Sequence, residues 1–227
     1  IDRPASIVKE LVENAIDAKS TKITIVIENG GKSKIQIIDN GVGMSQEDAL
    51  LAFERHATSK IRNVEDIIRI ASLGFRGEAI PSIASVSKME LITKEEDSDV
   101  ATRVAINFGK ISDVSKTSAN RGTDITISHL FDNLPARKKF LKSDQVEFKH
   151  IMDYIYYQAL TYPEVHFRLL HNGTERINYP AVDDQLKRLT AVLGKDFPHN
   201  DFVRIENQHG AVSVNGYIGG LEEVREG

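Results

Sequence analysis

The chain has 227 residues, of which 41% are hydrophobic and 27% are charged, and these values are ordinary for a soluble globular protein. Its net charge of −4 gives no overall basic field, so any contact with nucleic acid must come from a local patch. The chain has no cysteine, which excludes disulfides and cysteine-ligated zinc and fits a reducing compartment. Its seven histidines show no H-x-x-x-H spacing, which argues against a zinc hydrolase. No apolar run approaches the roughly 20 residues that a membrane span needs, and no signal peptide is found.

The first predicted element is a helix over residues 4–18, in which two stripes recur at helical spacing. One stripe is apolar and consists of Val8, Leu11, Val12 and Ala15. The other combines three acids with one amide and consists of Glu10, Glu13, Asn14 and Asp17. This polar stripe is either a solvated acidic face or the wall of a cleft whose carboxylate and amide groups face a metal-bound ligand. The helix alone does not decide between the two.

Strands and helices follow along the rest of the chain. Two strands form a hairpin around the turn Asn29-Gly30-Gly31, and Ser45 begins a helix with Asp48 in an arrangement close to a capping box. A polar stretch separates the later strands at 101–108 and 123–128. The predicted strands span 22–28, 34–39, 88–93, 101–108, 123–128, 165–171, 175–179, 201–206 and 211–218. The predicted helices after the first begin at Ser45 and lie near 64–70, 78–85, 148–160 and 185–193.

The pattern restarts after Pro180, which predicts a domain boundary there. One domain then covers residues 1–180 and a second covers 181–227. The second is too short to close a core of its own, and the chain begins without Met and almost at once inside a helix. We therefore expect a piece of a longer protein with an incomplete second domain.

The segment Gly30-Gly31-Lys32-Ser33 resembles the tail of a P-loop, a phosphate-binding turn. The full pattern needs a glycine five residues before Gly31, and that position is Val26 inside a strand. A P-loop also joins a strand to a helix, whereas this segment joins two strands. The pattern therefore indicates a hairpin turn.

Four other segments combine glycine or hydroxyl groups with charge. Asp39-Asn40-Gly41-Val42-Gly43-Met44 ends a strand on a carboxylate and continues with two glycines that let the backbone approach a flat ligand, although D-N-G alone is also a common turn. Gly74-Phe75-Arg76-Gly77-Glu78-Ala79 places a glycine-rich turn and a cation before a helix, where backbone N–H groups bind anions. With His56-Ala57-Thr58-Ser59-Lys60 it predicts a loop that covers phosphates. Arg121-Gly122-Thr123-Asp124 begins a strand and is weak alone.

The order of these segments resembles the motif set of the GHKL (Bergerat-fold) ATPases: E-x-x-x-N-x-x-D-A, D-N-G-x-G-M, G-F-R-G-E-A and G-T. The third motif, preceded by R-H-A-T-S-K, is similar to the form found in the mismatch-repair (MutL-type) members. R-P-A-S-I-V-K-E-L-V-E-N-A-I-D-A and N-L-P-A-R-K-K-F-L-K are also similar to that branch, so the resemblance covers nearly the whole chain.

The resemblance implies a Mg²⁺-dependent ATPase and a role for each matching residue. Glu10 would orient and deprotonate the attacking water, Asn14 would coordinate Mg²⁺, and Asp39 would bind the adenine amine with support from Thr123. Glu13 and Asp17 receive no catalytic role and are expected to be structural partners of neighbouring loops. The remaining nucleotide-binding positions would be Gly41, Gly43, Met44, Thr58, Ser59, Lys60, Gly74, Phe75, Arg76, Gly77 and Glu78.

The fold implied is α+β: a Bergerat-fold sandwich with a mixed, mostly antiparallel sheet, helices on one face, and the nucleotide between sheet and lid. Residues 181–227 would begin a ribosomal-protein-like βαβ domain. In the family that domain supplies a lysine to the γ-phosphate, and a segment before R-P-A-S helps to close the dimer over ATP. We expect both to be missing from this chain.

A basic run could contact nucleic acid, and it consists of Arg137, Lys138, Lys139 and Lys142. Cations beside a helix start usually form a solvated face, whereas the resemblance favours a sequence-independent contact with DNA phosphates. The partners implied are a second copy in an ATP-dependent homodimer, DNA, and the mismatch-recognition protein, nuclease and helicase of the repair pathway, with no membrane. The location implied is the cytoplasm near the nucleoid in a bacterium, or the nucleus in a eukaryote.

Three functions are compatible with a GHKL domain. The first is an ATP-gated dimerisation switch that hydrolyses ATP slowly in DNA mismatch repair. The second is a histidine-kinase phosphotransferase, which requires a helix bundle with a phospho-accepting histidine, and none of the seven histidines lies on one. The third is a non-catalytic ATP-gated DNA-binding or scaffold module, against which the presence of Glu10 argues.

Overall fold

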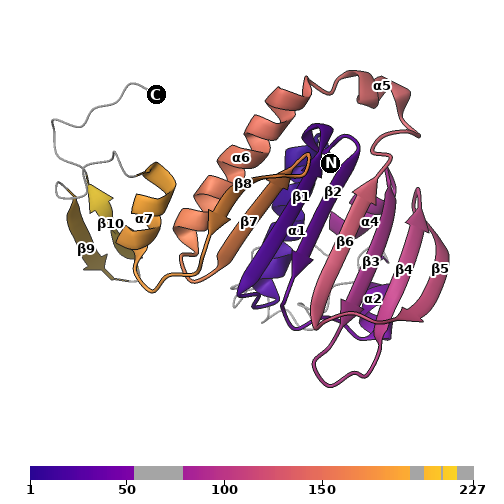
Figure 1. Cartoon of the computed structure of the whole chain (residues 1–227), viewed down its shortest axis with the longest axis horizontal. Helices are drawn as coiled ribbons and strands as arrows, with labels where there is room; N and C mark the ends of the chain where they lie inside the picture. The colour runs from indigo at the N-terminus through magenta and orange to yellow at the C-terminus, as the bar shows by residue number, and fades with distance from the viewer. Residues whose placement is uncertain (54–78, 195–201, 211, 219–227) are drawn as a thin grey trace.

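A computed structural model describes residues 1–53, 79–194, 202–210 and 212–218 (Figure 1). Its helical elements are α1 (Pro4–Asp17), η1 (Asn29–Gly31), α2 (Gln46–Leu51), α4 (Ala79–Ala84), α5 (Pro135–Lys139), α6 (Asp144–Thr161) and α7 (Gln185–Leu193). Its strands are β1 (Lys22–Glu28), β2 (Lys34–Asp39), β3 (Lys88–Lys94), β4 (Ala101–Asn107), β5 (Lys110–Thr117), β6 (Gly122–Ser128), β7 (His166–His171), β8 (Thr174–Tyr179), β9 (Val203–His209) and β10 (Val212–Ile218).

Eight strands form one sheet in the order β5-β4-β3-β6-β2-β1-β7-β8, and β9 pairs with β10 in a separate hairpin. Every neighbouring pair in the large sheet is antiparallel except β1 and β7, which run parallel. A parallel pair needs a long crossover, and the chain between β1 and β7 is long and includes α5 and α6. The predicted α+β architecture with a mixed, mostly antiparallel sheet is therefore confirmed.

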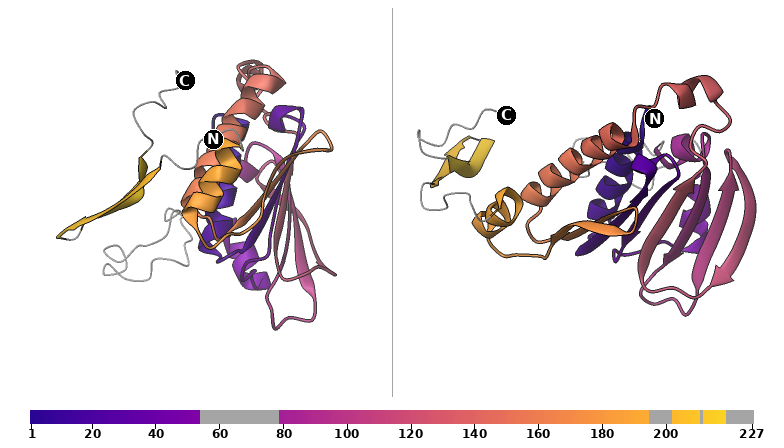
Figure 2. Two further views of the ribbon diagram at one scale, coloured as in Figure 1. Left: turned by 60° about the vertical axis from the view of Figure 1, so that its left-hand side comes forward. Right: turned by 45° about the horizontal axis from the view of Figure 1, so that its top comes forward.

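The helices cover one face of this sheet, and Figure 2 shows α1 and α6 side by side against it. Successive side chains of a strand point to opposite faces, so alternate residues are buried. On β1 the buried residues are Ile23, Ile25 and Ile27, and they share one core with the apolar stripe of α1. Within the described residues, no helix is long and apolar enough to cross a membrane.

Several local predictions are confirmed. The hairpin of β1 and β2 closes through η1 at the predicted Asn29-Gly30-Gly31 turn. The Ser45 hydroxyl accepts a hydrogen bond from the Asp48 N–H at 3.1 Å and begins α2 as predicted. The predicted helix near 64–70 lies outside the described residues.

Two predictions of secondary structure need correction. The polar stretch after β4 contains β5, an edge strand whose side chains are mostly exposed. The helix predicted over 148–160 begins at Asp144, because the Ser143 hydroxyl accepts a hydrogen bond from the Val146 N–H and caps the first turn. The structure also has a short helix that was not predicted, α5, which carries Arg137, Lys138 and Lys139 of the basic run and whose residues are all exposed.

A buried arginine fastens α7 to the large sheet. Arg188 is 1% exposed, and its guanidinium donates to four backbone carbonyls at distances from 2.7 to 3.0 Å. The accepting residues are Pro163, Val165, Tyr179 and Pro180. The predicted boundary near Pro180 stays a prediction, and these contacts tie the helix after it to the unit before it.

Candidate functional site

Three polar side chains lie in register at one end of the sheet. Asp39 on β2 faces Thr123 on β6, and Thr123 faces Thr93 on β3. Each residue is in phase with the buried positions of its strand, such as Ile37 and Ile125, so all three belong to the face that the helices cover. The sheet therefore ends in a polar row beside its apolar core.

Asp39 is a half-buried carboxylate with donors of its own. The Ser20 hydroxyl donates to Oδ1 of Asp39 at 3.0 Å, and the Gly41 N–H donates to the same oxygen at 2.8 Å. Burial raises the pKa of Asp39, and the hydrogen bonds from Gly41, Ser20 and Thr123 oppose this shift without cancelling it. A desolvated carboxylate of this kind favours a further hydrogen-bond donor, such as the exocyclic amine of a base.

Thr93 connects the row to the loop after β2. Its side chain is buried, and its hydroxyl accepts a hydrogen bond from the Met44 N–H at 2.9 Å. The same hydroxyl donates to the Gly122 carbonyl at 3.1 Å and lies 3.2 Å from the Thr123 hydroxyl. The sequence prediction included Met44 and Thr123 but missed Thr93, because no motif marks a threonine in the middle of a strand pattern.

Glycine is required at two positions beside Asp39, one in the loop after β2 and one at the start of β6. Gly43 has φ +72°, and a Cβ there would lie 2.0 Å from the Lys94 carbonyl oxygen. Gly122 has φ +116°, and its Cβ would lie 2.0 Å from the Asp39 carbonyl oxygen. Both positions combine a backbone conformation that L-residues rarely adopt with direct backbone contact, so the glycines set the position of the Asp39 loop.

The loop is also fastened to the end of α1. The Val42 N–H donates to the Ala18 carbonyl at 3.0 Å, and the Asn40 side chain accepts from the Thr21 and Lys22 N–H groups at 2.9 and 2.8 Å. From the other side, Nε of Arg121 donates to the Gly41 carbonyl at 3.1 Å. The helix that carries Glu10 and Asn14 is thereby held at a fixed distance from Asp39.

Glu10 and Asn14 lie one turn apart on α1, and both are half-buried. Glu13, on the same helix, is 3.9 Å from the Lys9 ammonium, and its side chain is 13% exposed. Burial raises the pKa of Glu13, Lys9 lowers it, and the neighbouring Glu10 and Asp17 raise it further. The stripe is therefore a partly desolvated wall in which the charges of Glu10 and Asp17 add to the effect of burial on the pKa of Glu13.

Two tyrosines, Tyr154 on α6 and Tyr162 just after its end, lie near the same stripe. The Tyr154 hydroxyl donates to the Lys9 carbonyl at 3.3 Å, and burial, then Glu13 and Glu10, raise the pKa of Tyr154. Burial, then Asp17 and Glu13, raise the pKa of Tyr162. Glu13 and Asp17 thus act electrostatically on tyrosines at α6, and their expected role as structural partners of neighbouring loops stays a prediction.

The structure brings some predicted site residues together and does not describe others. These described residues belong to α1, to the end of β2 with the loop after it, and to the start of β6: Glu10, Asn14, Asp39, Gly41, Gly43, Met44 and Thr123. The predicted lid lies outside the described residues: Thr58, Ser59, Lys60, Gly74, Phe75, Arg76, Gly77 and Glu78. The basic run Arg137, Lys138, Lys139 and Lys142 lies apart, on α5 and just before α6.

Comparison with known proteins accounts for this arrangement. Residues 3–138 match the profile of the "Histidine kinase-, DNA gyrase B-, and HSP90-like ATPase" family. The chain belongs to the GHKL ATPases. Within that family it corresponds to the N-terminal ATPase domain of MutL. It is 44% identical over 218 residues to the DNA mismatch repair protein MutL of Flavobacterium johnsoniae, and 45% identical over 219 residues to that of Chlorobium phaeobacteroides.

These alignments cover 96% of this chain but only 34% and 35% of the two relatives, so the chain spans about a third of their length. Among solved structures, the Aquifex aeolicus MutL ATPase domain complexed with ADP matches with a TM-score of 0.72 and 28% identity. That match covers 91% of this chain and 73% of the other. The N-terminal domain of a DNA repair protein matches with a TM-score of 0.78 and 26% identity, over 96% of this chain and 67% of the other. The chain is thus a GHKL-type ATPase domain of the MutL kind.

Proposed function

We propose that this GHKL domain binds ATP through Asp39 and hydrolyses it with Glu10, as the ATP-gated switch of a mismatch-repair protein. The observation that carries the proposal is the Asp39 site. Oδ1 of Asp39 already accepts hydrogen bonds from the Ser20 hydroxyl and the Gly41 N–H, so we assign the other carboxylate oxygen to the adenine amine. The raised pKa of Asp39 supports this assignment, because an added donor stabilises a charge that burial has left short of solvation. The ADP complex of the A. aeolicus domain also supports it.

Asn14 is the residue we assign to Mg²⁺. The described residues contain no group of three or more His, Asp or Glu side chains placed to hold a metal ion. Mg²⁺ in nucleotide sites takes few protein ligands and completes its shell with phosphate oxygens and water, so a single amide oxygen fits. The ion would neutralise charge on the phosphates.

Glu10 is the residue we assign to the attacking water. It lies on the face of α1 that carries Asn14, and a carboxylate there accepts a proton from water as the water attacks the terminal phosphorus. Phosphoryl transfer depends mainly on positioning and charge neutralisation, so a fixed carboxylate suffices as base. The hydrogen bond from the Val42 N–H to the Ala18 carbonyl supports a constant separation between α1 and the Asp39 end of the site.

For the whole protein we propose the biology of the MutL relatives. ATP binding would promote homodimerisation, and the dimer would pass a mismatch signal to a nuclease and a helicase after contact with a mismatch-recognition protein. DNA would bind through phosphate contacts on the basic run 137–142. The relatives reported above are bacterial, which favours the cytoplasm as the location.

The test is a matched pair of variants on α1. Glu10→Ala should retain ATP binding and lose turnover by a factor of about 100 or more, the usual contribution of a positioned general base. Glu13→Ala removes a carboxylate three residues further along the same stripe and should retain most of the turnover. Unchanged turnover in Glu10→Ala would favour the non-catalytic scaffold function.

Turnover that rises faster than linearly with protein concentration would support ATP-driven dimerisation, and strict proportionality would count against it.

A further inference from the structure

The segment before α6 exposes an aromatic ring among cations. Phe140 is 83% exposed, the highest value among the large hydrophobic side chains of the described residues. It directly follows α5, with Lys139 before it and Lys142 two residues after it, and both lysines are exposed. A single exposed apolar residue needs no explanation, but an exposed ring between cations is the arrangement of a stacking platform for nucleic acid.

The cations of the basic run are not equivalent. Lys138 pairs with Asp132 at 2.5 Å. The Arg137 guanidinium donates to the Ile1 carbonyl at 3.0 Å and lies 5.5 Å from the centre of the Phe131 ring. Within the described residues, the ammonium groups of Lys139 and Lys142 form no ion pair. The two lysines beside Phe140 are therefore the cations of this run that are available to an anionic partner.

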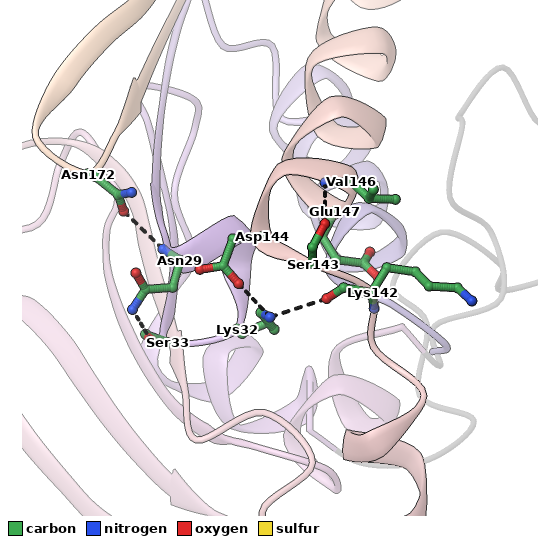
Figure 3. A network of polar contacts seen from close by, with 9 residues as sticks. All are labelled: Asn29, Lys32, Ser33, Lys142, Ser143, Asp144, Val146, Glu147 and Asn172. Atoms are coloured by element: carbon green, nitrogen blue, oxygen red, sulfur yellow. Dashed lines mark hydrogen bonds and ion pairs between the residues drawn. The ribbon is translucent and has the colours of Figure 1, made fainter.

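The backbone of Lys142 is held on both sides (Figure 3). Its N–H donates at 2.9 Å to Oε1 of Glu147, a carboxylate whose residue is 1% exposed. Its carbonyl accepts from the Lys32 ammonium at 3.2 Å, and that ammonium also pairs with Asp144. Figure 3 shows the Lys142 side chain directed away from these partners. The main chain is thus fixed while the ammonium group extends into solvent.

The turn that supplies Lys32 is itself seated on α6. A Cβ on Gly30 would lie 2.6 Å from the Asp144 carbonyl oxygen, so the turn and the first residue of α6 are in direct backbone contact. The Asn29 N–H donates to the Asn172 side chain at 2.9 Å, which anchors the turn to the β7–β8 connection. The Gly-Gly-Lys-Ser segment that resembles a P-loop therefore positions the start of α6.

We propose that Phe140, Lys139 and Lys142 bind single-stranded nucleic acid, with the Phe140 ring stacked on a base and the two lysines on the flanking phosphates. The inference rests on the proposed DNA contact of this domain and deepens it. A single strand is the favoured partner because its base faces are free, whereas a duplex buries them between neighbouring base pairs. Lys32 is a positioning residue that holds the main chain of Lys142.

The experiment measures binding of a fluorescent oligothymidylate and of a duplex to the full chain, by anisotropy over a range of salt concentrations. Phe140→Ala should weaken single-strand binding about 5- to 100-fold and leave duplex binding unchanged, in line with the loss of one base–aromatic stack. Phe140→Trp should restore it. Tyr157→Ala is the matched control, because Tyr157 is an aromatic residue that is 70% exposed on α6, away from the basic run.

The lysines have a separate signature. Lys139→Ala and Lys142→Ala should each reduce the slope of log affinity against log salt by about 0.7, the value for one phosphate contact on a single strand. Lys32→Met should lower affinity and Lys32→Arg should restore it, because arginine can also donate to the Lys142 carbonyl.

Three results would overturn the inference. Phe140→Ala could bind the single strand like the parent chain, it could weaken single-strand and duplex binding equally, or it could change only self-association in gel filtration. ATP binding is measured on the same samples. A parent chain that binds ATP but no single strand therefore overturns this inference while the proposed ATPase function stands.

Discussion

The replacement Asp39→Asn is predicted to separate nucleotide binding from stability. Asparagine has the shape of aspartate, and its amide oxygen can still accept from Ser20 and Gly41. The second carboxylate oxygen becomes an NH₂ group that meets the adenine amine donor to donor. A hydrogen bond to a charged group contributes about 1.5–3 kcal/mol, so ATP affinity should fall by a factor of about 10 to 150.

The same replacement should not weaken the free protein. Because burial raises the pKa of Asp39 above its ordinary value, the folded state holds this proton more tightly than the unfolded state. The carboxyl therefore lowers stability as pH rises through the window between the unfolded and folded pKa, and the loss persists at neutral pH. An uncharged amide removes this loss, so the free energy of unfolding of nucleotide-free Asp39→Asn at pH 7 should equal or exceed that of the parent. The difference should disappear at a pH below both pKa values.

The matched control is Asp124→Asn. Burial also raises the pKa of Asp124, but this residue follows Thr123 and therefore lies on the opposite face of β6, where Gln36 donates to both of its oxygens at 3.0 Å. It should keep the ATP affinity of the parent. The assays are calorimetric titration with ATP and GTP, and urea unfolding without nucleotide. Parent-like ATP affinity in Asp39→Asn, or an equal loss in Asp124→Asn, would refute the assignment of adenine recognition to Asp39.

Three other replacements test the frame of the site. Gly43→Ala should reduce ATP affinity and lower the unfolding free energy, because its Cβ would displace the backbone at Lys94. The loss should exceed the roughly 1–2 kcal/mol that an L-residue costs in the left-handed conformation. Gly173→Ala is the control in urea unfolding, because Gly173 has φ +77° but no atom within 4 Å of an added Cβ, so that only the backbone strain is measured. Thr93→Val should cost about 1–3 kcal/mol and weaken ATP binding, because the Met44 N–H loses its acceptor; parent-like values in both measurements would contradict the role given to this hydroxyl. Arg188→Met should cost on the order of 3 kcal/mol, since the carbonyls around the buried guanidinium lose their donor, while ATP affinity is unchanged. A smaller urea midpoint shift than that of Arg188→Lys would show that the hydrogen bonds contribute little.

Local signals predicted much of the fold from the sequence. The apolar stripe of α1 follows from helical spacing, and the Ser45 cap and the glycine turn at residue 30 follow from backbone chemistry that depends on a few neighbouring residues. The family resemblance likewise rests on short motifs, and the match over residues 3–138 confirms it. Such features are determined within a few residues, so one sequence suffices to predict them.

Other features depend on contacts between distant segments. β5 carries mostly exposed, polar side chains. It is a strand because its backbone N–H and C=O groups pair with those of β4, and this pairing does not depend on the side chains. Thr93 joins the site only because three strands align in register. Arg188 is buried only because four carbonyls of two segments, residues 163–165 and 179–180, meet around it.

The basic run 137–142 also shows what the sequence determines and what only the tertiary structure decides. Its composition determines that positive charge is concentrated there, but the sequence could not distinguish Lys138, which Asp132 neutralises, from Lys142, whose main chain Glu147 and Lys32 hold. Composition determines which groups are present. Only the tertiary structure decides which of them are already paired, because pairing depends on distances between residues that lie far apart in the chain.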